Sequence, residues 1–275
     1  PEAGAAIWFT VALIVATTSF SLAVINYNAL GALWSAEPQQ QTKITLTREA
    51  FGLIGLLFAS VVPAVLQLTW DPEQSFFFYS IALTVLLVFA VFLFTRWSAQ
   101  HTQIANQHTP QSVQWREMLQ VIAQERIFYS VYAISMLASA IPAVLVLFFI
   151  RDRIGAEDYT GLFLLLYFIS GAAGMPLWQQ LASRYGNVAA WMMAMILAVG
   201  AFIWAFFTAQ GDIVPYAMIC IFSGLALGGE LALPPAIIAE RIHQKQQLSY
   251  TATHFAAMGF FSKASLAIAA GALLP

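Results

Sequence analysis

The sequence predicts an all-α polytopic membrane protein, and two observations support this prediction. Of the 275 residues, 60% are hydrophobic and only 9% are charged, whereas soluble domains carry about 25% charged residues. The apolar residues also gather in eight runs of the length that a helix needs to cross a bilayer. We therefore expect eight transmembrane helices and no soluble core.

Taken in order, the eight apolar runs define the expected spans, and most connections between them are short. The spans cover residues 5–33, 46–69, 75–96, 127–150, 159–182, 188–209, 213–238 and 251–274. One connection, 97–126, is long and rich in Gln, Thr and His, with a short amphipathic piece near 113–122. This loop separates a first part, 1–96, with three spans from a second part, 127–275, with five.

Lys and Arg are distributed unevenly between the connections. Those after the first, third, fifth and seventh spans hold seven of them, whereas those after the second, fourth and sixth hold only Arg151 and Arg153. Because positive residues mark cytoplasmic connections, we expect the central loop in the cytoplasm and the protein in the cell (inner) membrane. Large transporters commonly pair equal halves, so we expect three more helices before Pro1 and one after Pro275.

Several functional classes lack support in the sequence. The net charge of −2 and the lack of a basic stripe argue against nucleic acid as a partner. Cys220 is the single cysteine, so no intrachain disulfide is expected. The four histidines lack metal-ligand spacing, and no nucleophile–base motif or phosphate loop is present. We therefore expect no enzyme activity, no metal and no cofactor.

Two charged residues lie deep within predicted spans. Glu230 falls in 213–238 and Lys263 in 251–274. A charge at the centre of a span costs at least ~2.5–3.5 kcal/mol, so such residues mark functional sites by default. Pro234 and Pro235 follow Glu230 and remove two helical N–H donors beside it. Glu230 is a candidate proton carrier and Lys263 a candidate cation partner or solute contact; a purely structural pair is the alternative.

Polar side chains near the ends of the first two spans are further candidates. Asn26, Tyr27 and Asn28 offer two amides and a phenol, which suit a hydroxyl-rich ligand; hydrogen bonding between packed helices is the alternative. Arg48 could clamp a sugar or carboxylate, or extend to the interface beside Glu49. Pairs of glycines predict close helix contacts at Gly52 and Gly55, Gly171 and Gly174, and Gly224 and Gly228.

The stretch 26–37 (NYNALGALWSAE), followed by Thr42 and 48–51 (REAF), resembles a signature of the glycoside–pentoside–hexuronide:cation symporters. This family belongs to the major facilitator superfamily and includes the melibiose permeases. The stretches 165–178, 181–186 and 234–240 are also similar, and Lys263 falls where the family has a lysine in its eleventh helix. The resemblance covers nearly the whole chain, as helices four to eleven of a twelve-helix fold.

The resemblance also implies a function. In that family the fourth, fifth, tenth and eleventh helices form a central sugar and cation site, which points to Asn28, Arg48 and Lys263, with Tyr27 adjacent. Val24 stands where melibiose-type members carry an acid, which disfavours a sodium site on this helix and favours proton coupling through Glu230.

The expected function is therefore cation-coupled symport of a sugar or similar polar solute by alternating access, with H⁺ or Na⁺ as the coupling ion. A transporter of an amphipathic lipid or drug is the alternative. A membrane sensor with the same fold that does not transport is another.

Overall fold

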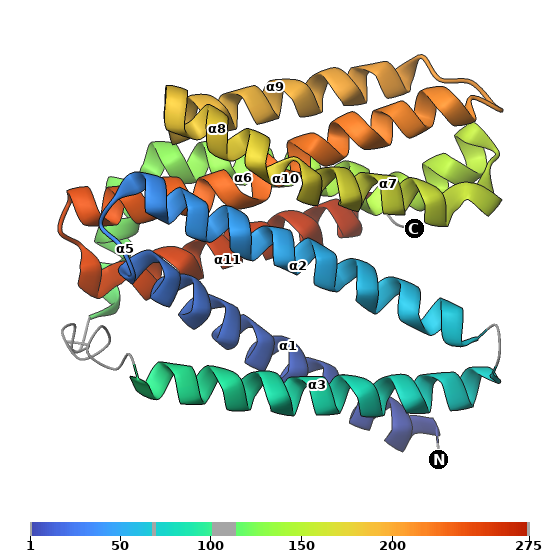
Figure 1. Ribbon diagram of the computed structural model, residues 1–275, viewed down its shortest axis with the longest axis horizontal. Coiled ribbons are helices and arrows are strands. Elements are labelled where there is room, and N and C mark those ends of the chain that lie inside the picture. The colour runs from blue at the N-terminus through green and yellow to red at the C-terminus, as the bar shows by residue number, and fades with distance from the viewer. Residues whose placement is uncertain (1, 68–69, 101–113, 274–275) are drawn as a thin grey trace. The chain divides into compact units, whose positions relative to one another are not determined.

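The computed structural model describes residues 2–67, 70–100 and 114–273, and these ranges contain helices and no strand (Figure 1). Within each of these ranges the connections between the helices are short. In chain order the elements are α1 (Glu2–Leu33), α2 (Pro38–Leu66), α3 (Pro72–Gln100), α5 (Trp115–Gln124), α6 (Arg126–Phe148), η1 (Phe149–Ile154), η2 (Glu157–Tyr159), α7 (Thr160–Ala173), α8 (Met175–Tyr185), α9 (Asn187–Phe206), α10 (Ile213–Gln244), η3 (Leu248–Tyr250) and α11 (Thr251–Leu273).

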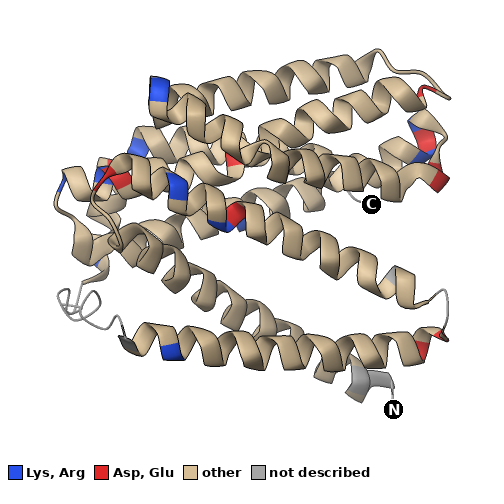
Figure 2. Ribbon diagram, in the orientation of Figure 1, with Lys and Arg blue, Asp and Glu red and all other residues tan. Residues whose placement is uncertain are grey.

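The eight predicted spans are confirmed. Within the described ranges, 8 helical stretches are long and apolar enough to cross a membrane, the fifth of them combining η2, α7 and α8. Figure 2 shows that Lys, Arg, Asp and Glu gather near helix ends and are sparse along the helices, as a hydrocarbon environment requires. The eight spans are compatible with helices four to eleven of a twelve-helix fold. The predicted amphipathic piece is present as α5.

The second span begins earlier than the sequence suggested. Its helix α2 starts at Pro38, whereas the apolar run starts at residue 46. The additional residues are polar, but Gln41, Thr42 and Thr45 are buried. Gln41 Nε2 donates to the Ser35 carbonyl at 2.7 Å, and Thr45 Oγ1 to the Thr42 carbonyl at 3.0 Å. Because these polar groups have hydrogen-bond partners inside the protein, helix α2 begins before the apolar run begins.

The chain forms two compact units, and each is described by itself. Unit 1 consists of Pro1–Gln41, Pro110–Phe149 and Pro234–Pro275, and unit 2 of Thr42–Thr109 and Ile150–Leu233. The boundary within α10 falls directly before Pro234, where the proline ring removes a helical hydrogen bond. The loop 97–126 is predicted to separate two six-helix halves. This division differs in kind from the two units and stays a prediction.

In unit 1, α6 packs against α11 through aromatic side chains. Phe128 and Tyr132 are buried and stack one turn apart, with ring centroids 6.0 Å apart. Tyr129 stacks on Phe261 of α11 at 5.6 Å. Aromatic pairs at this separation add about 0.5–1.5 kcal/mol beyond the area that they bury. The first pair lies within α6, and the second joins α6 to α11.

In unit 2, α10 crosses α7 with almost no space between the backbones. A Cβ added to Gly224 would lie 2.2 Å from the Tyr167 carbonyl oxygen, and one added to Gly228 would lie 2.6 Å from the Gly171 oxygen. The predicted close contacts at these glycines are therefore confirmed. The prediction of close helix contacts is wrong for Gly52 and Gly55, because an added Cβ there meets nothing within 4 Å.

Gly224→Ala is expected to prevent stable assembly of unit 2. The methyl group would meet backbone atoms of α7, which cannot rotate away, so the cost exceeds the ~1–3 kcal/mol of ordinary overpacking. The thermal melting of the purified protein in detergent measures this effect. Gly200→Ala in α9, where nothing lies within 4 Å, is the matched control and should melt at or slightly above the parent temperature. Equal melting temperatures for Gly224→Ala and Gly200→Ala would contradict the close crossing of α10 with α7.

Candidate functional site

Lys263 lies in the middle of α11, about 18 Å from the start of the helix at a rise of about 1.5 Å per residue. Its side chain is exposed, and its ammonium group donates a hydrogen bond to Ser21 Oγ on α1. Ser21 in turn donates to the Thr17 carbonyl, so its hydroxyl oxygen is free to accept from Lys263. In unit 1 the cation is thus held by a neutral hydroxyl group.

The three polar residues near the end of α1 do not share one face. Asn28 lies seven residues, or two turns, beyond Ser21 and therefore on the same side of the helix. The half-buried Ser21 and Asn28, together with the buried Ala29, follow this side. Asn26 and Tyr27 are exposed on other sides, and Asn26 Nδ2 donates to the Leu22 carbonyl of its own helix at 2.8 Å. Asn28 therefore lies on the same side of α1 as Ser21, which accepts the hydrogen bond from Lys263. Asn26 and Tyr27 do not lie on that side.

Arg48 lies deeper than the sequence suggested. Because α2 begins at Pro38, Arg48 is about 15 Å along the helix rather than at its end. Its guanidinium group donates to Glu49 Oε1 from Nη2 at 2.8 Å and from Nε at 3.1 Å. Both side chains are largely covered. A neutralised pair of this kind is far less costly within a span than either charge alone.

Glu230 lies near the middle of α10, and its side chain is 7% exposed. It follows the close crossing at Gly224 and Gly228, and it interacts electrostatically with Tyr167 of α7. The crossing is therefore followed by a buried carboxyl group that lies within electrostatic range of a phenol inside unit 2. Glu230 belongs to unit 2 and Lys263 to unit 1, so their proposed pairing stays a prediction.

A buried polar contact links α2 to α9 in unit 2. Thr42 Oγ1 donates to Asn187 Oδ1 at 2.8 Å, and both residues are buried. Asn187 is the first residue of α9. No sequence pattern predicts this contact, because its two residues lie 145 positions apart.

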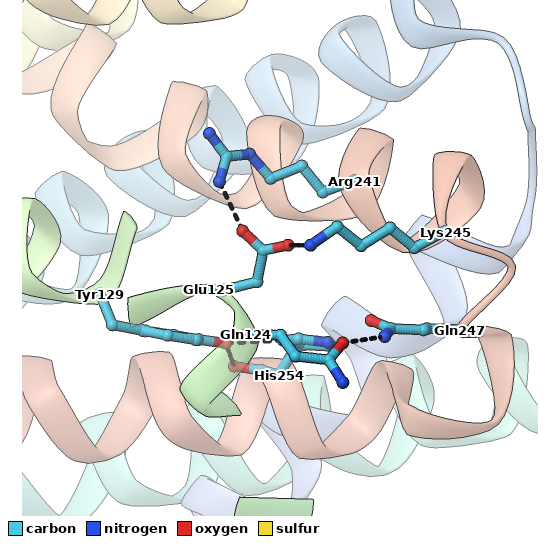
Figure 3. A network of polar contacts seen from close by, with 7 residues as sticks. All are labelled: Gln124, Glu125, Tyr129, Arg241, Lys245, Gln247 and His254. Carbon is cyan, nitrogen blue, oxygen red and sulfur yellow. Dashed lines mark hydrogen bonds and ion pairs between the residues drawn. The ribbon is translucent and has the colours of Figure 1, made fainter. Parts of the chain in front are cut away.

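Sequence reasoning also missed an ion cluster at the end of unit 1 where α5, α6, α10 and α11 meet (Figure 3). Glu125, between α5 and α6, accepts from Arg241 Nη1 at 2.5 Å and pairs with Lys245; both cations lie near the end of α10. The Glu125 side chain is 3% exposed, whereas the two cations are partly exposed. We call Glu125, Arg241 and Lys245 the Glu125 cluster.

The charge state of Glu125 follows from these contacts. Burial alone would raise the pKa of the carboxyl group, but hydrogen bonds and charges from Lys245 and Arg241 outweigh burial and hold the pKa below its usual range. Glu125 is therefore a carboxylate at neutral pH, and it ties the start of α6 to the end of α10.

Two histidines secure further helix ends of unit 1. The Tyr129 hydroxyl lies 2.8 Å from His254 Nδ1, and both residues are buried. His243 Nε2 lies 2.8 Å from the Ala32 carbonyl oxygen. A carbonyl oxygen only accepts, so this nitrogen carries a proton and caps the last turn of α1. These contacts bind α1 to α10 and α6 to α11.

Glu125→Gln is expected to lower the stability of the protein at neutral pH by about 1–3 kcal/mol, because hydrogen bonds to a charged group are lost. Since the folded-state pKa is depressed, this stabilisation is present above the usual carboxyl range and is lost as the pH falls through the folded-state pKa. The melting difference between parent and variant should therefore shrink in acid. The control Glu157→Gln removes an exposed acid in η2 and should change little. A melting difference between parent and Glu125→Gln that stays the same at all pH values would contradict a depressed pKa for Glu125.

The eight spans define a polytopic membrane protein, and single charged residues near the middle of α10 and α11 are typical of the solute-transporter class. The chain matches, over residues 1–275, the family model described as MFS/sugar transport protein, and it therefore belongs to the major facilitator superfamily. No curated protein matches the chain. The protein is thus a membrane transporter, and the family points to a small-molecule solute as its substrate.

Proposed function

We propose that this protein is a cation-coupled symporter that moves a sugar or a similar polar solute by alternating access. Solute contact is assigned to Asn28, Arg48 and Lys263, and coupling to Glu230 and Lys263. Asn26 and Tyr27 would contact the solute from the other sides of α1. The coupling ion is a proton or a sodium ion, and the proton is favoured because Val24 offers no carboxylate on α1.

The observation that carries the proposal is the exposed ammonium group of Lys263 in the middle of α11. Such a group cannot face lipid tails without a cost of at least ~2.5–3.5 kcal/mol. It must therefore face water, solute or protein at that depth. Ser21 satisfies one of its three N–H donors, which leaves others to bind hydroxyl or carboxylate oxygens of a solute.

The coupling role of Glu230 rests on its burial and its position. A carboxyl group at the middle of a span binds a proton in one conformation and releases it in another only if its surroundings change. Pro234 and Pro235 follow it by one helical turn, and unit 2 ends directly before them. Movement at this weakened turn would change the environment of Glu230.

The finer assignments extend the same proposal. The stretches 26–37 and 48–51 favour a transporter similar to the melibiose permeases within the superfamily. The distribution of Lys and Arg favours the cell (inner) membrane, with the loop 97–126 in the cytoplasm. Six-helix halves on either side of that loop would rock about the central site.

Uptake into vesicles tests the proposal. The full-length protein is reconstituted and offered a panel of radiolabelled neutral sugars, sugar acids and amphipathic solutes, with an imposed proton or sodium gradient. We expect accumulation of at least one polar solute above its external concentration, driven by one of the two gradients. Transport of amphipathic solutes alone, or no flux with any solute, would contradict it.

A further inference from the structure

We propose that α5 is a membrane-interface helix that binds anionic phospholipid headgroups. The exposed Trp115 and Leu119 would lie at the boundary between headgroups and acyl chains, and Arg116 and Arg126 would contact the lipid phosphates. This inference does not depend on which solute the protein transports.

Helix α5 is amphipathic. Val121 is buried in unit 1, and Glu117 and Gln124 lie on the same side of the helix. Trp115 and Leu119 lie on the opposite side and are 65% and 57% exposed. A helix that packs by one edge and exposes large apolar residues on the other is typical of helices lying in a membrane interface.

Two side-chain hydrogen bonds hold α5 against the connection between α10 and α11. Gln247 Nε2 donates to Gln124 Oε1 at 2.8 Å (Figure 3), and the Tyr250 hydroxyl donates to Glu117 Oε2 at 3.4 Å. These contacts lie near the two ends of α5, and both partners belong to the connection between α10 and α11. Because α10 and α11 are membrane spans, their connection marks the membrane boundary. The helix therefore runs along the boundary rather than away from it.

Helix α5 leads almost directly into the span α6. This span begins at Arg126, two residues after α5 ends, and its first turn exposes Ile127 at 74%. The exposed apolar edge of α5 thus lies close to the apolar surface of a span. Tryptophan is enriched at this level of a membrane because its ring is apolar and its N–H is polar.

Two arginines near α5 carry positive charge that no acid in the described ranges neutralises through an ion pair. The Arg116 guanidinium group lies 5.4 Å from the centre of the Trp115 ring, and Arg126 is exposed. Among the described residues neither arginine forms an ion pair. Glu117, the nearest acid on α5, faces Tyr250 instead. One cation beside an exposed Trp and a second at the start of α6 complement an anionic lipid surface.

Spin labels on α5 test the proposal in the full chain reconstituted into vesicles. Leu119→Cys and Gln120→Cys are each made in a Cys220→Ser background and labelled with a nitroxide. The vesicles contain phosphatidylcholine alone or with phosphatidylglycerol. We expect the Leu119 label to be more accessible to oxygen than to a water-soluble nickel complex, and the neighbouring Gln120 label to show the reverse. A Leu119 label open to nickel, or shielded from both reagents by protein, would overturn the lipid assignment.

Removal of charge tests the headgroup assignment separately. Phosphatidylglycerol should raise the ratio of oxygen to nickel accessibility at the Leu119 label, and Arg116→Gln combined with Arg126→Gln should abolish this difference. Arg153→Gln, which removes an exposed arginine from η1, should preserve it. Equal ratios in the two kinds of vesicle for the parent, or a difference that persists without both arginines, would overturn binding to anionic headgroups.

Discussion

Lys263→Ala is expected to lower solute uptake by about 10- to 100-fold, because hydrogen bonds from a charged group typically contribute about 1.5–3 kcal/mol. The substitution removes the only cation of α11 and leaves Ser21 of α1 without its partner. Uptake of the identified solute into vesicles, normalised to the amount of inserted protein, measures the effect.

Two controls separate loss of solute contact from loss of structure. The Lys263→Ala protein should melt close to the parent temperature, because the Lys263 side chain is exposed and little packing is removed. Ser21→Ala keeps the cation and removes only its acceptor, so it should reduce uptake less than Lys263→Ala. Normal uptake by Lys263→Ala would refute a role for this residue in the solute path.

Glu230→Gln is expected to abolish accumulation of solute while leaving exchange intact. Glutamine has nearly the shape of the acid, so the crossing of α10 with α7 should persist, but its amide does not bind and release a proton at working pH. For one proton per solute, a gradient of one pH unit supports roughly tenfold accumulation. The variant should instead only equalise the solute across the membrane.

Exchange of labelled for unlabelled solute is the matched measurement for Glu230→Gln, since it needs solute binding and conformational change but no net proton movement. Parent and variant should exchange at similar rates. Accumulation by the variant at the parent level, under the same proton gradient, would exclude Glu230 as the coupling residue.

The sequence predicted the spans well because lipid demands long apolar runs, and such runs are visible without any knowledge of packing. It placed the start of α2 too late because hydropathy records polarity and not burial. Gln41, Thr42 and Thr45 are polar and buried, and their hydrogen bonds depend on neighbours that a hydropathy window does not see.

The glycines show a related limit. Gly52 and Gly55 have the same spacing as Gly171 and Gly174, yet only the second pair faces another helix. Spacing establishes that two small residues share a helix face, but the packing of the whole unit decides what that face meets. Glycine spacing alone therefore predicted one pair correctly and the other wrongly.

The candidate site was predicted only as single residues. Glu230 and Lys263 were conspicuous because charges are rare within spans, but Ser21 was not, because a serine in a span has many ordinary roles and its partner lies 242 positions away. The Glu125 cluster was missed for a similar reason. Its members look like ordinary charges near helix ends, and only the fold shows that Glu125 is buried between two cations.

The most direct test of the account is whether water reaches the level of Lys263 inside the membrane. Ala267, one turn from Lys263 on the same side of α11, is exposed and small, as is Gly200 within α9. Each is replaced by cysteine in a Cys220→Ser background and treated in sealed vesicles with a charged thiol reagent. We predict that Ala267→Cys reacts and Gly200→Cys does not until the protein is denatured. If Ala267→Cys were equally protected, no solute path would pass Lys263, and the central claim would be contradicted.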